Sequence, residues 1–185
     1  MQTVSLEIPD VKLLTPTRHG DDRGFVSEVY NARTLDAAGV PSRFVQENHS
    51  YSKFAGTVRG LHFQRAQFSQ AKLVRVLAGA ILDVAVDLRR TSPTFGRHVS
   101  ATLSADNWAQ IYIPEGFAHG FCTLEPDTAV SYLMSTLYAP ASDAGVLWDD
   151  PALSIAWPVS AADAILSPKD AKLPPLAALA PDLLF

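Results

Sequence analysis

Cysteine is almost absent from this chain of 185 residues, and Cys122 is its only thiol. One thiol can form neither a disulfide within the chain nor a thiolate zinc site. A chain without disulfides is typical of a reducing compartment. We therefore expect a cytoplasmic protein whose fold is stabilised by its apolar core.

Excess positive charge and long apolar runs are lacking as well. The chain has 15 Lys and Arg against 19 Asp and Glu, so its formal net charge is -4, and no basic stretch predicts nucleic acid as the main partner. A phosphate-bearing ligand would instead need a local cluster of positive charge. No apolar run approaches the roughly 20 residues that cross a bilayer, and the first residues do not resemble a signal peptide. We expect neither a nucleic-acid partner nor a membrane partner.

Short β-rich runs separated by Gly, Pro, Asp and Ser fill most of the sequence. The connectors at 78–80 and 125–127 have hairpin length, which favours antiparallel pairing over βαβ crossovers. One short helix is expected over 32–38, before Gly39, and another from a capping box that Ser160 begins. The expected strands are 11–15, 25–30, 72–77, 81–88, 98–103, 109–113, 117–124 and 129–138.

The fold class predicted from this pattern is all-β. We expect one jelly-roll-like domain over residues 1–185, a barrel or sandwich with a few peripheral helices. A C-terminal extension of about 160–185, interrupted by prolines, is expected to pack on the barrel. Alternation within the strands places His119 on one face with Phe121, and Tyr132 on another face with Met134. Two faces of mixed polarity in one small domain predict a lined pocket.

A metal site would need more ligands than the sequence offers. Jelly-roll barrels of the cupin type often hold a metal on His-x-His, a Glu and a further His. His62 and His119 match two of these positions, but Gln64 replaces the second histidine and no carboxylate follows in 65–70. Two imidazoles fall short of the three or four protein ligands expected for zinc or non-heme iron. We therefore predict no metal, and a metal-dependent cupin oxygenase or isomerase remains the alternative from another class.

Several long motifs occur in an order that resembles a known family. They are FVQENHSYSKFAGTVRGLHFQ, QAKLVRVLAGAILDVAVDLRRTSPTFG and IPEGFAHGF, with DDRG before them and VLWDDPALSIAWP and SPKD after them. Over about residues 10–172 the chain resembles the dTDP-4-dehydrorhamnose 3,5-epimerases of deoxysugar biosynthesis. The resemblance implies a cupin-like homodimer without metal or organic cofactor. Its implied substrate is dTDP-4-dehydro-6-deoxy-D-glucose, converted at C3 and C5 to dTDP-4-dehydro-L-rhamnose.

The resemblance also implies roles for individual residues. The base falls on His62, the acid on Tyr132, and the carboxylate paired with the base on Asp170. Further substrate contacts fall at or beside Arg23, Glu28, Gln46, Glu47, Asn48, Arg59, Lys72, His119, Asp143 and Lys169. The chain departs from the family in the loop 65–69, which lacks the usual proline-rich turn, and at Asp143, where a glutamate is common.

The implied chemistry matches these residue types. Epimerisation beside a ketone removes a proton from one face of the sugar and returns one to the other, so two proton carriers are needed. An unperturbed imidazole titrates near neutral pH, so His62 can be the base, and Asp170 would fix its tautomer. The phenol of Tyr132 is a proton donor at pH 7. Lys72 would stabilise the enolate oxygen, because a fixed positive charge there is commonly the largest catalytic effect.

The remaining expectations concern binding and alignment. Arg59 and Arg23 are candidates for the diphosphate, since guanidinium groups match phosphate oxygens in pairs. Thymine would be bound by amides such as Gln46 and Asn48, and Phe25 or Tyr138 would stack on it. Asp83 needs a partner if buried and would orient His119 or His62. Arg59 and His62 have opposite parity, so we expect a bulge at Gly60 to bring both into one cavity.

Two further alternatives remain open. An epimerase acting at C3 or C5 alone would carry the same motifs, and a non-catalytic sugar-nucleotide binding module would have no need of an acid and base pair. Dimerisation follows from the resemblance and from the N-terminal β segment with Arg23 and Glu28, which could pair with the sheet edge of a neighbouring chain.

Overall fold

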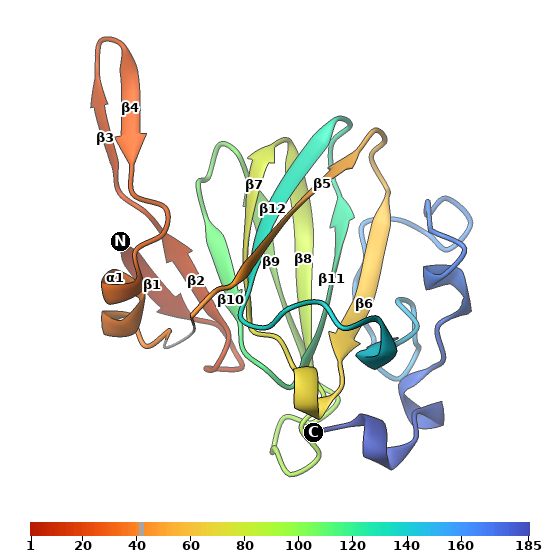
Figure 1. Cartoon of the computed structure of the whole chain (residues 1–185). Helices are drawn as coiled ribbons and strands as arrows, with labels where there is room; N and C mark the ends of the chain where they lie inside the picture. Colours follow the sequence, from red (N-terminus) through yellow and green to blue (C-terminus); the bar gives the residue numbers. More distant parts are fainter. Residues whose placement is uncertain (41–42) are drawn as a thin grey trace.

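Two antiparallel sheets face each other in the computed structural model, which describes residues 1–40 and 43–185 (Figure 1). The first sheet has six strands in the order β1 (Gln2–Ser5), β2 (Lys12–Thr15), β10 (Gln110–Ile113), β7 (Lys72–Ala78), β12 (Thr128–Met134) and β5 (Gln46–Ser52). The second has five in the order β13 (Asp143–Gly145), β6 (Val58–Gln64), β11 (Phe117–Thr123), β8 (Ala80–Asp87) and β9 (His98–Ser104). The predicted all-β class is confirmed. In the described residues the pairings form these two sheets and a separate two-stranded one, and they close no barrel.

The main core lies between the two sheets and follows from strand alternation. Val74 and Val76 of β7 face inward from the six-stranded sheet, and Ile81, Ala85 and Phe117 face them from the five-stranded sheet. Because side chains alternate along a strand, residues two positions from these also point into the gap. The interior therefore receives polar residues at the ends of the same inward-facing rows.

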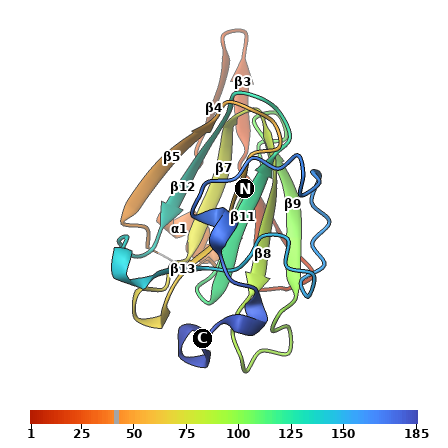
Figure 2. The same cartoon turned by 90° about the vertical axis from the view of Figure 1, so that its right-hand side faces the viewer.

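The outer faces of both sheets are covered. Helix α1 (Ala32–Ala37), capped by the side chain of Asn31, packs Leu35 on the six-stranded sheet against Leu14 and Leu73. The predicted helix over 32–38 is confirmed, with its last residue at the C-cap. The C-terminal segment covers the outside of the five-stranded sheet, where Phe185 packs in a cluster with Phe63 (Figure 2). That segment contains the short 3₁₀ turns η3 (Asp170–Lys172), η4 (Leu176–Ala178) and η5 (Pro181–Leu183).

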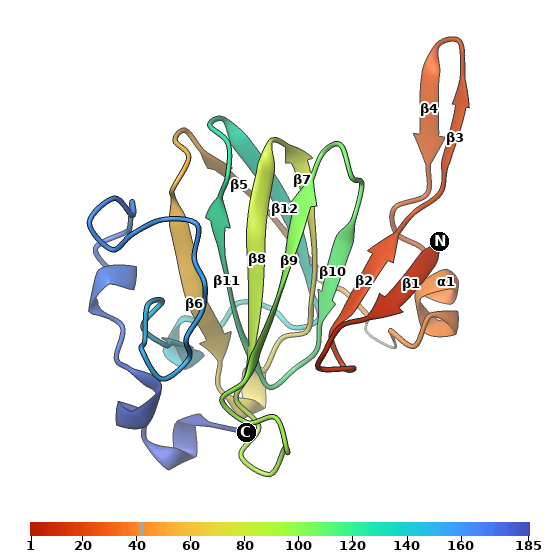
Figure 3. The ribbon, with the colours of Figure 1, turned by 180° about the vertical axis from the view of Figure 1, so that it is seen from behind.

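A hairpin of β3 (Arg18–Asp21) and β4 (Gly24–Ser27) projects away from both sheets (Figures 1 and 3). Its side chains are mostly exposed, including Phe25 and Val26. The predicted strand 25–30 corresponds to β4, which ends at Ser27 and is shorter than predicted at its C-terminal end. Among the described residues, no helix is long and apolar enough to cross a membrane.

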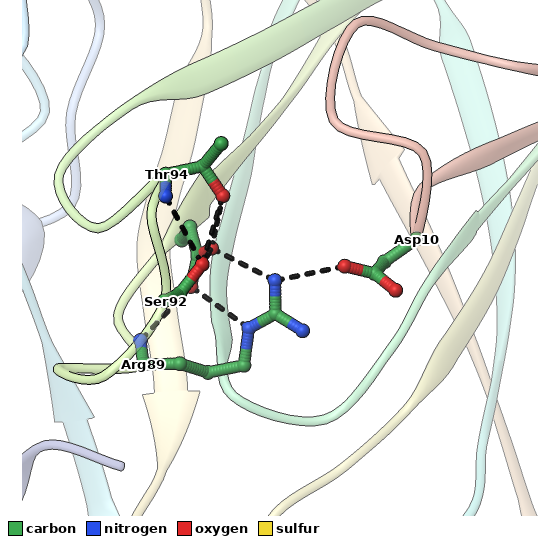
Figure 4. Close-up of polar contacts among 5 residues, drawn as sticks. Asp10, Arg89, Ser92 and Thr94 are labelled. Carbon is green, nitrogen blue, oxygen red and sulfur yellow. Dashed lines mark hydrogen bonds and ion pairs between the residues drawn. The ribbon is translucent and has the colours of Figure 1, made fainter.

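The connector from β8 to β9 is held by the carboxylate of Asp87, the last residue of β8. This fully buried carboxylate accepts hydrogen bonds from Arg89 (2.8 and 2.9 Å), Ser92 (2.6 Å) and Thr94 (2.6 Å). Arg89 also pairs with Asp10 at 2.9 Å, which links the connector to the N-terminal segment (Figure 4). The cluster fixes this end of β8 and the connector that follows, and none of its residues lines the cavity, described below, that holds most of the predicted site residues.

The expected helix that begins at Ser160 is wrong. Ser160 does donate to Asp163 at 2.6 Å, but the chain there forms a turn and no helix. The reason is a competing backbone pairing, since Ile165 exchanges hydrogen bonds with Gly56 and Val58 and is drawn into an extended path.

The short connectors have the predicted hairpin length but do not join paired strands. The turn at 78–80 joins β7 to β8, and the turn at 125–127 joins β11 to β12, so each carries the chain from one sheet to the other. Connector length determines how tight a turn is, but burial of the apolar faces of both strands between the sheets determines where each strand pairs. The strands on either side of each connector do pair antiparallel, as predicted, but their partners are other strands of the chain. Two 3₁₀ turns, η1 (Ala66–Phe68) and η2 (Pro140–Ser142), complete the fold.

Candidate active site

A cavity of about 290 Å³ opens between the two sheets. Strands β5, β7 and β12 line it from the six-stranded sheet, and β6, β11 and β13 line it from the five-stranded sheet. Most of the predicted site residues lie there: Asn48, Arg59, His62, Lys72, His119, Tyr132, Tyr138, Asp143, Lys169 and Asp170.

His62 and Asp170 form a close polar pair in the cavity. His62 Nε2 lies 2.6 Å from Asp170 Oδ1, and the histidine is about one-third exposed (32%) while the carboxylate is buried. Burial by itself raises the pKa of Asp170, but the hydrogen bond and charge of His62 outweigh it and hold that pKa below its ordinary value. Because the Asp170 carboxylate is hydrogen-bonded to Nε2–H of the neutral ring, Nδ1 is the unprotonated nitrogen and can accept a proton.

Tyr132 lines the cavity from β12, in the sheet opposite to the one that carries His62. It packs beside the main core. The two side chains that the sequence predicts as proton carriers thus reach the same space from opposite walls. Packed sheets lie about 10 Å apart, which leaves room for one ring between the groups.

A β-bulge brings Arg59 and His62 to the same side of β6. On β11, His119 pairs with His62 of β6, and Phe121 pairs with Arg59 of β6. The two β11 residues are two positions apart, whereas the two β6 residues are three positions apart, so β6 contains one extra residue. Gly60 lies in this stretch with φ of 127°, which favours glycine. The predicted bulge is confirmed, and both residues line the cavity.

Lys72 begins β7 and is buried, with 8% of the residue exposed. Burial lowers its pKa to about 8, against the opposing influence of the Asp83 and Asp143 charges. The lysine can therefore present a weakly hydrated positive charge to a bound oxygen. It lies on the same wall as Tyr132, since β7 and β12 are neighbours.

Asp83 lies behind the cavity wall and pairs with His119. Asp83 Oδ2 is 2.9 Å from His119 Nε2, and both residues are buried. Burial lowers the pKa of His119, against the influence of Asp83, so the ring is uncharged at neutral pH. Of the two histidines that Asp83 was expected to orient, the structure selects His119.

Polar residues at the rim form a second network. Asp143 pairs with Lys169 and accepts a hydrogen bond from the Tyr138 hydroxyl at 3.0 Å, which raises the pKa of that phenol. Gln46 donates to Asn48 at 3.0 Å and accepts from the backbone of Tyr138 at 2.8 Å. The shorter acid at 143 thus still reaches both neighbours.

Three of the predicted contact residues lie away from the cavity of their own chain. Arg23 is on the projecting hairpin and pairs with Asp21, and Glu28 follows that hairpin and accepts from Asn31. Glu47 accepts from Ser131 on the outer face of the six-stranded sheet. Gln46 and Asn48 are its strand neighbours, so alternation alone puts Glu47 on the opposite face, and the sequence already contained that signal.

One cavity residue received no role from the sequence. Gln64 donates to the carbonyls of Phe68 and Leu137 and accepts from the amide of Ala139, at 2.8, 3.3 and 2.6 Å. It therefore braces the altered loop 65–69 against the segment after β12. Gln64 lies two positions after His62 on β6, so strand alternation already indicated that both side chains share the cavity face.

Phe25 packs edge-on against Trp108, with ring centroids 5.0 Å apart, and not in the cavity, so Tyr138 is the stacking candidate that lines it. Within residues 1–40 and 43–185, no group of three or more His, Cys, Asp or Glu is placed to hold a metal ion.

These groups in a two-sheet cavity define an isomerase of the acid and base type. Comparison with known proteins identifies its family: residues 5–178 match the family model described as dTDP-4-dehydrorhamnose 3,5-epimerase. The chain belongs to the dTDP-4-dehydrorhamnose 3,5-epimerase family, as the motif resemblance predicted.

Individual relatives agree over nearly the whole chain. The dTDP-4-dehydrorhamnose 3,5-epimerase of Sinorhizobium fredii is 49% identical, covering 95% of this chain and 89% of that protein. The crystal structure of a Bacillus anthracis dTDP-4-dehydrorhamnose 3,5-epimerase with TDP and PPi bound has a TM-score of 0.92 at 51% identity, covering 95% of this chain and 99% of the other. The Legionella pneumophila dTDP-6-deoxy-D-glucose-3,5-epimerase in complex with dTDP-4-keto-L-rhamnose has a TM-score of 0.93 at 42% identity, covering 99% and 96%.

Proposed function

We propose that this protein epimerises C3 and C5 of dTDP-4-dehydro-6-deoxy-D-glucose and releases dTDP-4-dehydro-L-rhamnose. The observation that carries the proposal is the placement of His62 and Tyr132 on opposite sheets around one cavity. Inversion at a carbon beside a ketone requires a base on one face of the sugar and an acid on the other. Family membership supplies the substrate.

The proton transfers can be written with these residues. Nδ1 of His62 removes the proton next to the C4 ketone, the C–H electron pair forms the enolate, and Asp170 stabilises the resulting imidazolium. Lys72 stabilises the negative C4 oxygen. The Tyr132 hydroxyl then returns a proton to the carbon from the far face, and solvent restores both groups. The same cycle acts at each carbon in turn.

Binding of the nucleotide uses the rim of the cavity. Arg59 lines the cavity and donates to Ser52 and to the backbone of Tyr51, which holds its guanidinium in place for the diphosphate. Asn48, kept in position by Gln46, and the ring of Tyr138 are the candidates for thymine. Lys169, paired with Asp143, adds positive charge at the entrance.

We further propose a homodimer of cupin-like jelly-roll subunits that share their sites through the β3–β4 hairpin. Arg23 is 89% exposed at the side chain and lies on a hairpin that projects from its own sandwich (Figure 1). A hairpin with exposed Phe25 and Val26 is suited to contact a second copy, and it would bring Arg23 and Glu28 to the partner's cavity.

The dimer is tested by sedimentation and by complementation. Arg23→Ala and His62→Ala subunits, each weak alone, should regain up to about one quarter to one half of wild-type activity when mixed and reassembled, because one site per dimer is then intact. A monomer in solution, or mixtures no more active than their parents, would contradict the shared site.

The reaction is tested by NMR of dTDP-4-dehydro-6-deoxy-D-glucose in deuterated buffer containing enzyme and a chelator. Deuterium at both C3 and C5 is the expected result. Deuterium at one carbon would identify an epimerase of narrower action, exchange at neither carbon a binding module, and loss of exchange only with chelator a metal-dependent enzyme. His62→Ala should abolish exchange, and His98→Ala, on β9 outside the cavity, should retain it.

A further inference from the structure

Asp83 is a fully buried carboxylate with one oxygen that lacks a hydrogen bond. Strand β8 carries it between Ile81 and Ala85, both of which belong to the main core. Its Oδ2 lies 2.9 Å from His119 Nε2, whereas Oδ1 has no hydrogen-bond partner in the described part of the chain. A buried carboxylate in apolar surroundings is costly unless a positive charge lies near. The position therefore requires a cation.

Lys72 is that cation. It enters the same interior from the opposite sheet and is nearly as buried as Asp83. Burial lowers the pKa of Lys72, and the negative charge of Asp83 is the largest influence that raises it. Asp143 also acts on Lys72, but it is paired with Lys169, and Asp170 is paired with His62. Asp83 is thus the anion of the cavity region that is free to compensate Lys72.

We propose that Asp83 is a positioning residue that sets the protonation of two cavity groups at once. It holds His119 as the tautomer with its proton on Nε2, and it keeps Lys72 charged at neutral pH. The importance of Lys72 for catalysis rests on the proposed epimerase function, but the two protonation states do not.

The chemical consequence concerns what the two facing walls of the cavity offer a substrate. With Nε2–H donating to Asp83, the Nδ1 atom of the neutral His119 ring remains a hydrogen-bond acceptor. Lys72 is a donor with a positive charge. An acceptor on one wall and a cation on the opposite wall suit a sugar that carries a hydroxyl next to a carbonyl, and a single buried carboxylate maintains both.

The other charged and titratable groups around the cavity come from every element that packs there. They are His62 and Arg59 on β6, Tyr132 on β12, Asp143 on β13, and Tyr138, Lys169 and Asp170 on the segments that follow. The other two carboxylates of this group are already paired, Asp143 with Lys169 and Asp170 with His62, whereas Asp83 is hydrogen-bonded to His119. Removing the charge of Asp83 should therefore act mainly on Lys72 and His119.

The first test is an NMR titration of the Lys72 side chain, assigned with the Lys72→Arg variant. In Asp83→Asn, which keeps the shape and loses the charge, the Lys72 midpoint should fall by about one pH unit or more, as expected for loss of a nearby opposite charge. An unchanged midpoint would overturn the proposal.

Asp87→Asn is the matched control, because Asp87 is an equally buried aspartate on the same strand whose partners are Arg89, Ser92 and Thr94. It should leave the Lys72 midpoint in place. A general loosening of the sandwich would move the midpoint in both variants and would likewise argue against a specific role of Asp83.

The second test uses the wild-type protein and does not depend on the folding of any variant. Nitrogen-15 shifts of the His119 ring at pH 7 should identify Nε2 as protonated and Nδ1 as unprotonated. A proton on Nδ1 alone would overturn the proposal, because an unprotonated Nε2 cannot donate to a carboxylate.

The third test reads activity against pH. The rate of the wild-type protein should fall as pH rises through about 8, where Lys72 loses its proton. In Asp83→Asn this fall in rate should move to lower pH. For a shift of about one unit the rate at pH 8 should be about fivefold lower, because the protonated fraction of Lys72 falls from about one half to about one tenth, whereas Asp87→Asn should keep the wild-type profile. An inactive wild-type protein would contradict the proposed function, and the two NMR tests would still decide the role of Asp83.

Discussion

His62 and Asp170 lie 108 positions apart in the sequence, yet His62 Nε2 and Asp170 Oδ1 are 2.6 Å apart at one wall of the cavity. The histidine comes from β6 and the carboxylate from the first residue of η3, which contacts β6. The backbone amide of Asp170 donates to Ser167 at 3.0 Å, and this contact fixes the turn that presents the acid. The proposed base lies on a strand and is thus oriented by a carboxylate from the C-terminal segment.

Asp170→Asn should lower the turnover rate by about 100-fold or more while leaving the Michaelis constant within a few-fold. The amide cannot stabilise the imidazolium and favours the wrong tautomer of His62. Steady-state kinetics check this. Asp163→Asn, in an exposed turn outside the cavity, is the control and should keep normal rates. Equal rates in wild type and Asp170→Asn would remove Asp170 from the mechanism.

Tyr132→Phe should separate proton exchange from inversion. Without the phenol, His62 still removes the α-proton, but deuterium returns to the face from which the proton left, so exchange continues while epimerisation falls by about 100-fold. NMR in deuterated buffer measures both rates in one sample. Tyr51→Phe, whose hydroxyl binds Asp127 outside the cavity, should leave both unchanged. Normal inversion in Tyr132→Phe would require another acid.

Asp87→Asn should destabilise the fold at neutral pH and much less in acid. Burial by itself raises the pKa of Asp87, but the hydrogen bonds from Arg89, Ser92 and Thr94 outweigh it and lower the pKa from 3.8 to about 2. A depressed folded-state pKa contributes stability above the unfolded value, which is lost as pH falls toward 2. The shift corresponds to on the order of 2 kcal/mol at neutral pH.

Chemical denaturation of wild type and Asp87→Asn between pH 2 and pH 7 measures this effect. The difference in unfolding free energy should shrink steadily below pH 4. Asp10→Asn removes only the half-exposed outer partner of Arg89 and should cost less than about 1 kcal/mol. A difference independent of pH would mean that the cluster contributes through its shape alone.

Gly60→Ala should destabilise the protein by about 3 kcal/mol or more and displace both Arg59 and His62. The new Cβ would lie 2.5 Å from Gly120 Cα and 2.8 Å from the His119 carbonyl, at a φ of 127° that side chains disfavour. Thermal unfolding measures the loss. Gly20→Ala is the control, since its Cβ would come no closer than 3.4 Å to other atoms, and it should change stability by less than about 0.5 kcal/mol.

Local periodicity predicted the central strands well. The runs that became β7, β8, β9, β11 and β12 combine β-branched residues with alternation, and their predicted bounds agree with the structure to within a few residues. Strand β5 was missed because QENHSYS is polar at nearly every position. Its strand structure depends on a seven-residue register with β12, a partner more than 70 residues away in the sequence.

The candidate site was predicted from motifs, and its errors have geometric causes. The strand position of Glu47 puts it on the outer face, which alternation would have indicated. Arg23 and Glu28 carry no such signal, because the direction of a projecting hairpin depends on the packing of the segments at its base. Gln64 was noted only as a missing metal ligand, although its three hydrogen bonds brace the rim of the cavity.

The sequence by itself determined the all-β class, the alternating inward faces, the family and the side chains capable of acid and base chemistry. Each of these depends on residue identity and on spacing over a few positions. The tertiary structure decided which strands pair across the two sheets, that His119 takes Asp83 and His62 takes Asp170, and that burial lowers the pKa of Lys72 to about 8. These features depend on groups brought together from distant segments, because desolvation and charge act through space and not along the chain.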